Sequence, residues 1–129
     1  MNTASLLIGR VLLAHIFLLA GISKISAYSG TGAYMASMGV PAALLPAVIA
    51  LEIVGGLALL VGWQTRWVAY ALAAFTLVAA LVFHFSPGDQ MQMILFMKNI
   101  AMVGGFVILA ATGPGALSLD GRRLQASAS

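Results

Sequence analysis

The chain has 129 residues, of which 62% are apolar and only 7% are charged. A soluble domain of this size has much surface for its volume and usually carries about 25% charged residues. This composition therefore excludes a soluble domain and indicates a polytopic membrane protein in contact with the lipid bilayer. The net charge of +3 comes from so few residues that the pI of about 9.8 is no argument for a nucleic-acid partner. There is no cysteine, which excludes disulfides, thiolate metal ligands and redox thiols.

Four apolar segments approach the roughly 20 residues that a spanning helix needs. They cover residues 6–25, 44–62, 67–85 and 91–111. Glycines and a proline in residues 26–43 predict an extramembrane loop, with a short interfacial helix around residues 33–38. Short polar stretches at 63–66 and 86–89 predict tight connections. We therefore predict an all-α, four-transmembrane-helix bundle that forms a single domain over residues 1–129 and ends in a polar tail at 113–129.

Basic residues near the helix ends predict the orientation of the bundle. With four spans, both termini and the second connection lie on the same side of the membrane. That side carries four arginines, namely Arg10, Arg66, Arg122 and Arg123, whereas the other side carries Lys24 and Asp89. The pattern predicts that both termini lie in the cytoplasm.

Arg10, His15, Glu52, Lys98 and Asn99 lie well inside the predicted spans, and Lys24 and His84 lie near span ends. Each central charge costs about 2.5–3.5 kcal/mol on insertion scales, so three unpaired charges would cost roughly 8–10 kcal/mol. That is comparable to the whole net stability of a domain, about 5–15 kcal/mol. We therefore expect the charged side chains to face the bundle interior and one another.

Helical rise and phase suggest how these groups are arranged. Glu52 and Lys98 lie at nearly the same depth, with His15 almost level and Arg10 nearer the cytoplasmic side. Gly55 shares a face with Glu52 and would let a neighbouring helix approach closely. The prediction is an ion pair between Glu52 and Lys98, with Arg10 behind it.

Each of these residues also has a structural interpretation. Arg10 could be a snorkelling anchor, and His15 a hydrogen-bonded interior histidine. Lys24 and His84 lie near helix ends and suit interfacial positions. The Glu52–Lys98 pair could serve only to hold helices together, although apolar packing usually does this as well.

No histidine or carboxylate cluster has the spacing of a metal site, so neither a metal nor a covalent cofactor is predicted. No catalytic residue is assigned.

The chain resembles the DoxX family of small four-helix bacterial membrane proteins. The matching residues, in chain order, are Gly9-Arg10, Phe17, Ala20-Gly21-Ile22-Ser23-Lys24, Leu51-Glu52, Gly55-Gly56, Gly62, Thr65-Arg66, Lys98-Asn99, Gly104-Gly105, Gly113-Pro114-Gly115 and Ser118-Leu119-Asp120. Many relatives carry a carboxylate just before or early in the last span, where this chain has Gln90 and Gln92. Inferences that rest on that carboxylate do not transfer.

The resemblance implies a location in the bacterial cytoplasmic (inner) membrane and a redox association. Some family members are subunits of quinone-reducing sulfur-oxidising or terminal oxidase systems, and others are linked to quinone resistance or to complexes that resist oxidative stress. The residues it implies here are Arg10, Lys24, Glu52 and Lys98-Asn99.

Three functions are compatible with the sequence. The leading hypothesis is a redox-associated subunit that interacts with quinone or quinol, or with a small anionic electron donor. Glu52 would exchange protons, Lys98 and Asn99 would hold a polar oxygen, and Arg10 would influence the pKa of Glu52. The second hypothesis is a non-catalytic assembly or anchoring subunit for a membrane or soluble partner. The third is a small-solute transporter, for which so short a chain would need to form a homo-oligomer.

Overall fold

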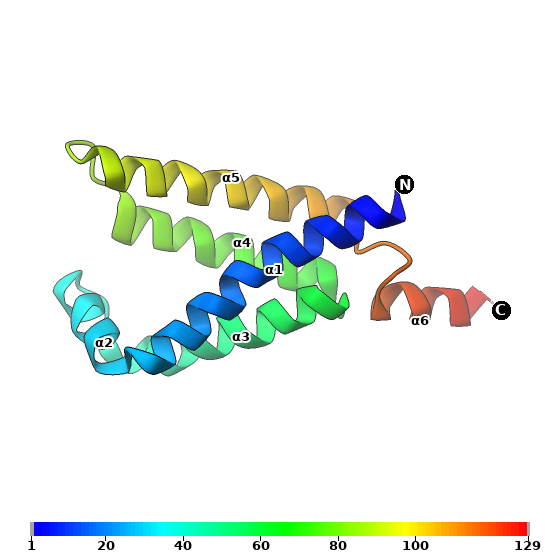
Figure 1. The fold of residues 1–129 in the computed structure, drawn as a ribbon, viewed down its shortest axis with the longest axis horizontal. Helices are drawn as coiled ribbons and strands as arrows, with labels where there is room; N and C mark the ends of the chain where they lie inside the picture. The colour runs from blue at the N-terminus through cyan, green and yellow to red at the C-terminus, as the bar shows by residue number, and fades with distance from the viewer. Residues whose placement is uncertain (1, 129) are drawn as a thin grey trace.

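The computed structural model describes residues 2–128, and the outermost positions of the predicted domain, Met1 and Ser129, lie outside the described residues. The described chain is helical and contains no strand, which confirms the all-α prediction. In chain order the elements are α1 (Thr3–Ser26), α2 (Tyr28–Ser37), the 3-10 turn η1 (Ala42–Leu44), α3 (Leu45–Val61), α4 (Thr65–Ala79), the π-helical turn η2 (Ala80–His84), α5 (Gln90–Thr112) and α6 (Leu119–Ala128) (Figure 1).

Four helical segments are long and apolar enough to cross a membrane, as predicted. They cover residues 3–26, 42–61, 65–84 and 90–112, so each boundary differs from its predicted position by three residues or fewer. Local caps explain the differences. The side chain of Asn2 accepts a hydrogen bond from Ser5 N at 3.1 Å, and that of Asp89 accepts from Met91 N at 3.0 Å, so α1 and α5 begin earlier than hydropathy alone predicts.

Two short helices lie outside the four spans. The interfacial helix predicted around residues 33–38 is α2, which begins five residues earlier, at Tyr28. The tail, predicted only as polar, contains helix α6. That helix follows the segment of residues 113–118 and points away from the bundle (Figure 1).

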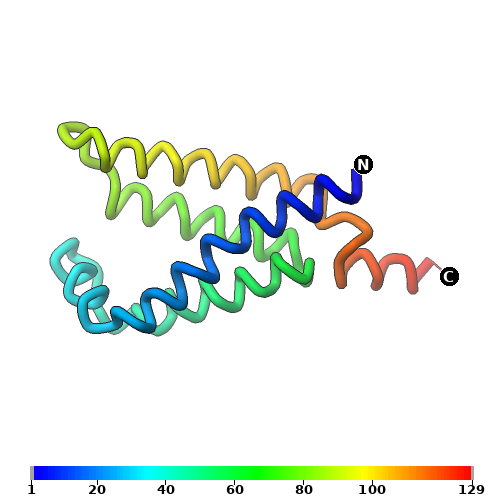
Figure 2. Tube along the Cα trace, in the orientation of Figure 1, coloured from blue at the N-terminus to red at the C-terminus, as the bar shows by residue number. Residues whose placement is uncertain are grey.

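The spans form two pairs, because α1 packs mainly on α3 and α4 mainly on α5. The pairs lie close together where α1 begins and α5 ends, which we call the terminal end of the bundle. They separate towards the opposite end, which carries α2 and which we call the α2 end (Figures 1 and 2).

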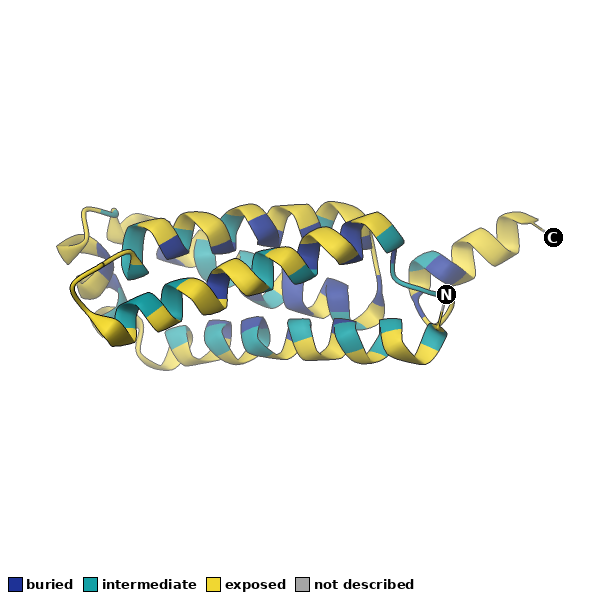
Figure 3. Cartoon of the chain, turned by 90° about the horizontal axis from the view of Figure 1, so that it is seen from above, coloured by how far each residue is buried: buried dark blue, intermediate teal, exposed yellow. Residues whose placement is uncertain are grey.

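The apolar core occupies the terminal half of the bundle. It combines alanines with a few large side chains, and its members are Ala14, Phe17, Leu59, Ala69, Leu72, Ala73, Phe106, Leu109 and Ala110. The rings of Phe17 and Phe106 meet with centroids 5.5 Å apart. Large apolar residues cover the outer faces of the spans and are exposed, as expected for surfaces that contact lipid (Figure 3).

The terminal end is held together by Arg10, whose side chain is only 1% exposed. Its guanidinium donates to Leu59 O at 3.1 Å and Leu60 O at 3.4 Å, near the end of α3, and to Leu117 O in the segment after α5. Leu59 lies seven residues beyond Glu52, about 10 Å along the helix axis. The predicted placement of Arg10 behind Glu52 is therefore wrong, and the guanidinium is neither snorkelling nor part of a charge pair.

Asp120 completes this end by capping α4. Its carboxylate accepts from Gln64 N at 2.9 Å and from Thr65 N at 2.8 Å, and its own backbone N–H donates to Gly62 O at 2.9 Å. A carboxylate at a helix N-terminus satisfies free N–H groups and complements the helix dipole. Gly62 ends α3 with a φ of +74°, and an added Cβ there would lie 2.4 Å from Arg10 Nη1.

Helices α1 and α3 lie close together at Gly56. An added Cβ at this position would lie 2.9 Å from Leu18 Cδ2 and 3.3 Å from the backbone oxygen of Ala14. The close approach predicted at Gly55 involves α4, since an added Cβ there would lie 3.1 Å from Leu72 Cδ2. At Gly104, by contrast, an added Cβ would meet nothing within 4 Å.

We expect Gly56→Ala to lower the free energy of unfolding by about 1–3 kcal/mol, because the added methyl group overpacks the contact between α1 and α3. The measurement is unfolding in mixed detergent micelles, followed by circular dichroism. Gly104→Ala is the matched control, because it makes the same change on an open helix surface, where alanine is the better helix former. Equal losses in the two variants would contradict this account of the contact.

Candidate functional site

A cavity of about 460 Å³ opens at the α2 end, where the two helix pairs separate. We call it the α2-end cavity. All four spans and α2 contribute to its walls, which are mostly apolar. Its polar and charged lining residues are Lys24, Thr31, Tyr34, Glu52, Thr76, His84, Lys98 and Asn99. A largely apolar cavity with a few convergent polar groups is the usual form of a small-molecule site.

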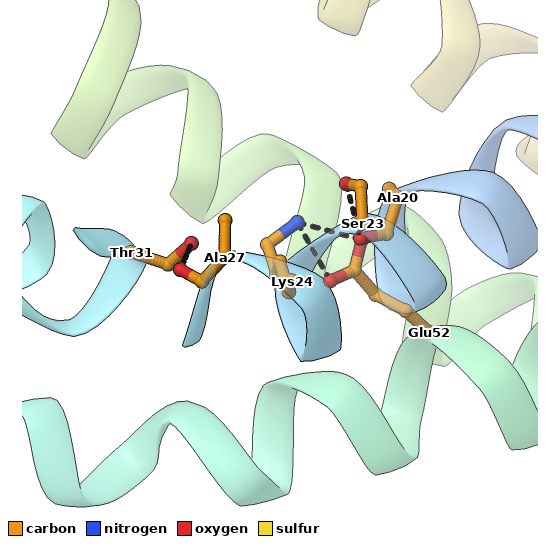
Figure 4. A network of polar contacts seen from close by, with 6 residues as sticks. All are labelled: Ala20, Ser23, Lys24, Ala27, Thr31 and Glu52. Atoms are coloured by element: carbon orange, nitrogen blue, oxygen red, sulfur yellow. Dashed lines mark hydrogen bonds and ion pairs between the residues drawn. The ribbon is translucent and has the colours of Figure 1, made fainter. Parts of the chain in front are cut away.

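Glu52 is buried in the wall of this cavity and forms an ion pair with Lys24 (Figure 4). Lys24 Nζ lies 2.9 Å from Glu52 Oε1 and 3.2 Å from Oε2. The two side chains form the only ion pair found within residues 2–128. The pair forms because α1 approaches α3 one turn earlier, at Gly21. An added Cβ at Gly21 would lie 2.6 Å from Ile53 Cγ1 and 3.4 Å from Glu52 Cβ.

This pairing corrects the predicted partner of Glu52. Lys24, expected as an interfacial anchor, supplies the counter-charge, and Lys98 does not. A signal for Lys24 was present in the sequence, because it falls on the same α1 stripe as Arg10, Ala14, Phe17 and Gly21. The last four are the buried residues of α1, and Lys24 is partly buried.

Lys98 and Asn99 line the same cavity from α5. Lys98 is exposed and has no ion-pair partner in the described chain, whereas Asn99 is buried. Lys98 lies eight residues into α5, about 12 Å from its first residue. The cavity thus holds two cations, Lys24 and Lys98, and one anion, Glu52, for a formal charge of +1.

His84 ends the π-helical turn at the mouth of the cavity. Its Nδ1 lies 2.9 Å from Gln92 Oε1 on α5, and the neighbouring Phe83 stacks on Tyr34 of α2 with ring centroids 5.6 Å apart. A π-helical turn is rare and often occurs at a functional site. His84 therefore lies at the helix end predicted for it, but it also lines the cavity.

His15 lies apart from this site. It is exposed on the outer face of α1, its Nδ1 contacts Leu12 O of its own helix, and it does not line the α2-end cavity. Two predictions for His15 are therefore wrong: that it belongs with the polar residues that face the bundle interior, and that it is a hydrogen-bonded interior histidine. The helical phase explains why, since His15 is turned about 140° from Arg10 on the buried stripe.

Thr76 and Tyr34 are cavity residues that the sequence interpretation did not select. Thr76 is neutral and lies within an apolar helix, so a search for embedded charges passes over it. Its spacing from Leu72 and Ala73, which are both buried, was the available signal. Within residues 2–128 no three His, Asp or Glu side chains gather in a group that could hold a metal ion.

Similarity to known proteins agrees with this architecture. Residues 5–85 match the DoxX family. The chain is 46% identical to the inner membrane protein YqjF of Escherichia coli K12 over 93% of this chain and 92% of the relative. It is 40% identical to the inner membrane protein YphA of the same organism, over 91% and 89%. It is also 30% identical to a Bacillus subtilis 168 protein named "Putative oxidoreductase CatD", over 86% and 81%. No solved structure matches the chain.

The fold and these relatives define a multi-pass helical membrane protein. The chain belongs to the DoxX family. Four apolar spans and two relatives named as inner membrane proteins both support an inner-membrane location.

We expect the Lys24–Glu52 pair to show strong coupling in a double-mutant cycle. Lys24→Met alone leaves a buried carboxylate without its partner and should be clearly destabilising, whereas adding Glu52→Gln should recover part of the loss. A coupling free energy of about 1–3 kcal/mol, measured by unfolding in detergent, would agree with the structure.

Lys98→Met provides the matched control for this cycle, because it removes another lysine that lines the same cavity. Its effect should add to that of Glu52→Gln within about 0.5 kcal/mol. Stronger coupling of Glu52 to Lys98 than to Lys24 would contradict the observed pairing.

Proposed function

We propose that the chain is a redox-associated membrane subunit whose α2-end cavity binds quinone or quinol, or a small anionic electron donor. One observation carries the proposal: an apolar cavity within the membrane-spanning bundle holds a neutralised ion pair and one further cation, Lys98, without a partner in the described chain. An embedded charge of this kind is costly and usually functional. It would attract an anion or an electron-rich oxygen.

The cavity fits such a ligand in size and in polarity. Its volume of about 460 Å³ falls within the range of roughly 300–1,000 Å³ typical of small-molecule sites. Apolar side chains such as Phe17, Val82 and Met102 would contact a ring or an isoprenoid chain. Lys98 and Asn99 would hold a polar oxygen, with Asn99 able both to donate and to accept.

Glu52 would exchange protons with the ligand in this proposal. It is buried, lines the cavity and lies against Lys24, so a proton gained or lost there would change the charge balance of the pair. Lys24, and not Arg10, would influence the pKa of Glu52, because Lys24 is the cation in contact with the carboxylate. The name of the Bacillus subtilis relative, which refers to an oxidoreductase, supports a redox role.

We also propose that the terminal end of the bundle faces the cytoplasm. Arg10, Arg66, Arg122 and Arg123 all belong to elements at that end, as the positive-inside rule requires. The α2-end cavity would then open in the outer half of the membrane.

The absence of cysteine gives a direct test of this orientation. We expect Gly88→Cys, in the loop between η2 and α5, to react with a membrane-impermeant maleimide in spheroplasts, while Ser127→Cys in α6 reacts only after the membrane is opened. The unmodified chain, which has no cysteine, is the blank. The opposite labelling pattern would show the reverse orientation.

We expect Glu52→Gln to abolish quinone-dependent protection in cells that lack the native gene and are challenged with menadione. Glutamine keeps an oxygen for Lys24 but cannot exchange a proton near neutral pH. The measurement is survival, with membrane levels of each variant checked by immunoblot. Normal protection at normal membrane levels would sink the proposal.

His15→Asn is the control for this experiment, because it changes a polar residue of the same membrane-spanning region that does not line the cavity. It should protect as well as the native chain. Co-purification of partner proteins with the Glu52→Gln variant addresses the assembly hypothesis. Loss of protection while partners are retained would separate chemistry in the cavity from assembly.

A further inference from the structure

Thr76, which lines the α2-end cavity, carries a buried hydroxyl without a hydrogen-bond partner in the described chain. The residue is 3% exposed and lines the cavity from α4, and its Oγ1 has no partner within the described chain. A buried hydroxyl that makes no hydrogen bond costs about 1–3 kcal/mol. Such a group is rare in folded proteins and calls for an explanation.

Most hydroxyls that lie within the described helices avoid that cost by bonding to their own helix. Six helical Ser and Thr side chains donate to a carbonyl three or four residues earlier, namely Ser23, Ser26, Thr31, Ser37, Thr112 and Ser127. The one other buried hydroxyl without a partner in the described chain, that of Thr65, lies outside the α2-end cavity. Thr76 has Leu72 and Ala73 at the same spacing and bonds to neither. Its hydroxyl is therefore free to bond to something within the cavity.

Two other buried polar groups of the cavity lie at a similar depth. Thr76 is eight residues from the end of η2 at His84, and Asn99 is nine residues from the start of α5 at Gln90. Glu52 is seven residues into α3. With a rise of about 1.5 Å per residue, all three lie roughly 10–14 Å in from the α2 end of their helices. The deep part of the cavity thus combines a hydroxyl, an amide and a paired carboxylate.

We infer that Thr76 and Asn99 form a hydrogen-bonding subsite for a neutral carbonyl or hydroxyl oxygen carried on an apolar ring. This inference rests on the proposed function and narrows its ligand to the quinone and quinol class. A hydroxyl and a carboxamide can each donate or accept a hydrogen bond. Together they can therefore donate to a quinone carbonyl or accept from a quinol hydroxyl. Lys98 lies at a similar depth along α5 but is exposed, so the buried groups of this subsite include no unpaired cation. A small inorganic anion would lose its hydration there and gain only neutral partners and a carboxylate.

The subsite predicts a specific pattern of binding to duroquinone and to durene, which has the same carbon skeleton without the oxygens. Binding is measured by equilibrium dialysis of the full chain in lipid nanodiscs, with empty nanodiscs to subtract partition into lipid. Thr76→Val keeps the β-branched shape, loses the hydroxyl and should weaken duroquinone binding about fivefold to thirtyfold. Thr76→Ser should bind within about threefold of the native chain, and durene should bind all variants equally.

Thr112→Val is the matched control, because its hydroxyl bonds to Leu109 O and it does not line the α2-end cavity. It should bind duroquinone as the native chain does. Thermal unfolding of each nanodisc sample separates loss of binding from loss of folding, and Thr76→Ser keeps the test valid if the valine variant does not fold.

The outcomes separate this inference from the proposed function. If the native chain prefers duroquinone to durene but Thr76→Val binds like Thr112→Val, the subsite is wrong and the proposed function stands. If the native chain shows no preference for duroquinone and binds sulfite instead, both the subsite and the quinone class are overturned. If it binds neither duroquinone nor sulfite, the proposed function fails as well.

Discussion

A buried guanidinium determines how the bundle is arranged. Arg10 joins α1 to the last carbonyls of α3 and to the segment that follows α5, so three parts of the chain are tied together at one end. The core of alanines and aromatic rings fills the space just beyond this tie. The helix pairs are free to separate only at the far end, where no comparable tie joins them within the described residues. The cavity lies there for that reason.

The embedded charges are consequently divided between two separate networks. At the terminal end, Arg10 is stabilised by backbone carbonyls, two of which lie in the last turn of α3, where the helix dipole places partial negative charge. At the α2 end, Glu52 is neutralised by Lys24, and Lys98 also lines the cavity. This division allows one end to be rigidly bonded while the other keeps polar groups available to a ligand.

Hydropathy predicted the four spans because it depends only on local composition, and the caps at Asn2 and Asp89 account for the small shifts in their ends. The partners of the charged residues depend on which helices meet and at what angle, and composition does not report this. Depth alone placed Lys98 beside Glu52. Depth does not reflect the long side chain of Lys24, or the close approach of α1 and α3 at Gly21 that brings this side chain within reach of Glu52. The partners of Arg10 are backbone carbonyls, and a pattern of charged side chains does not indicate these. Thr76 was missed for a related reason, since a neutral hydroxyl leaves no mark on a hydropathy profile.

The cap on α4 has a consequence for biogenesis. Asp120 satisfies N–H groups at Gln64 and Thr65, although it follows them by more than fifty residues in the chain. Synthesis runs from the N-terminus, so α4 enters the membrane before its cap exists, and the terminal end can close only after the last span and the segment behind it have emerged. A ribosome stalled after α5, or a fusion joined directly at Thr112, would leave four inserted helices without the bond that completes their assembly. The contacts of the C-terminal segment can thus form only late in the assembly of the bundle.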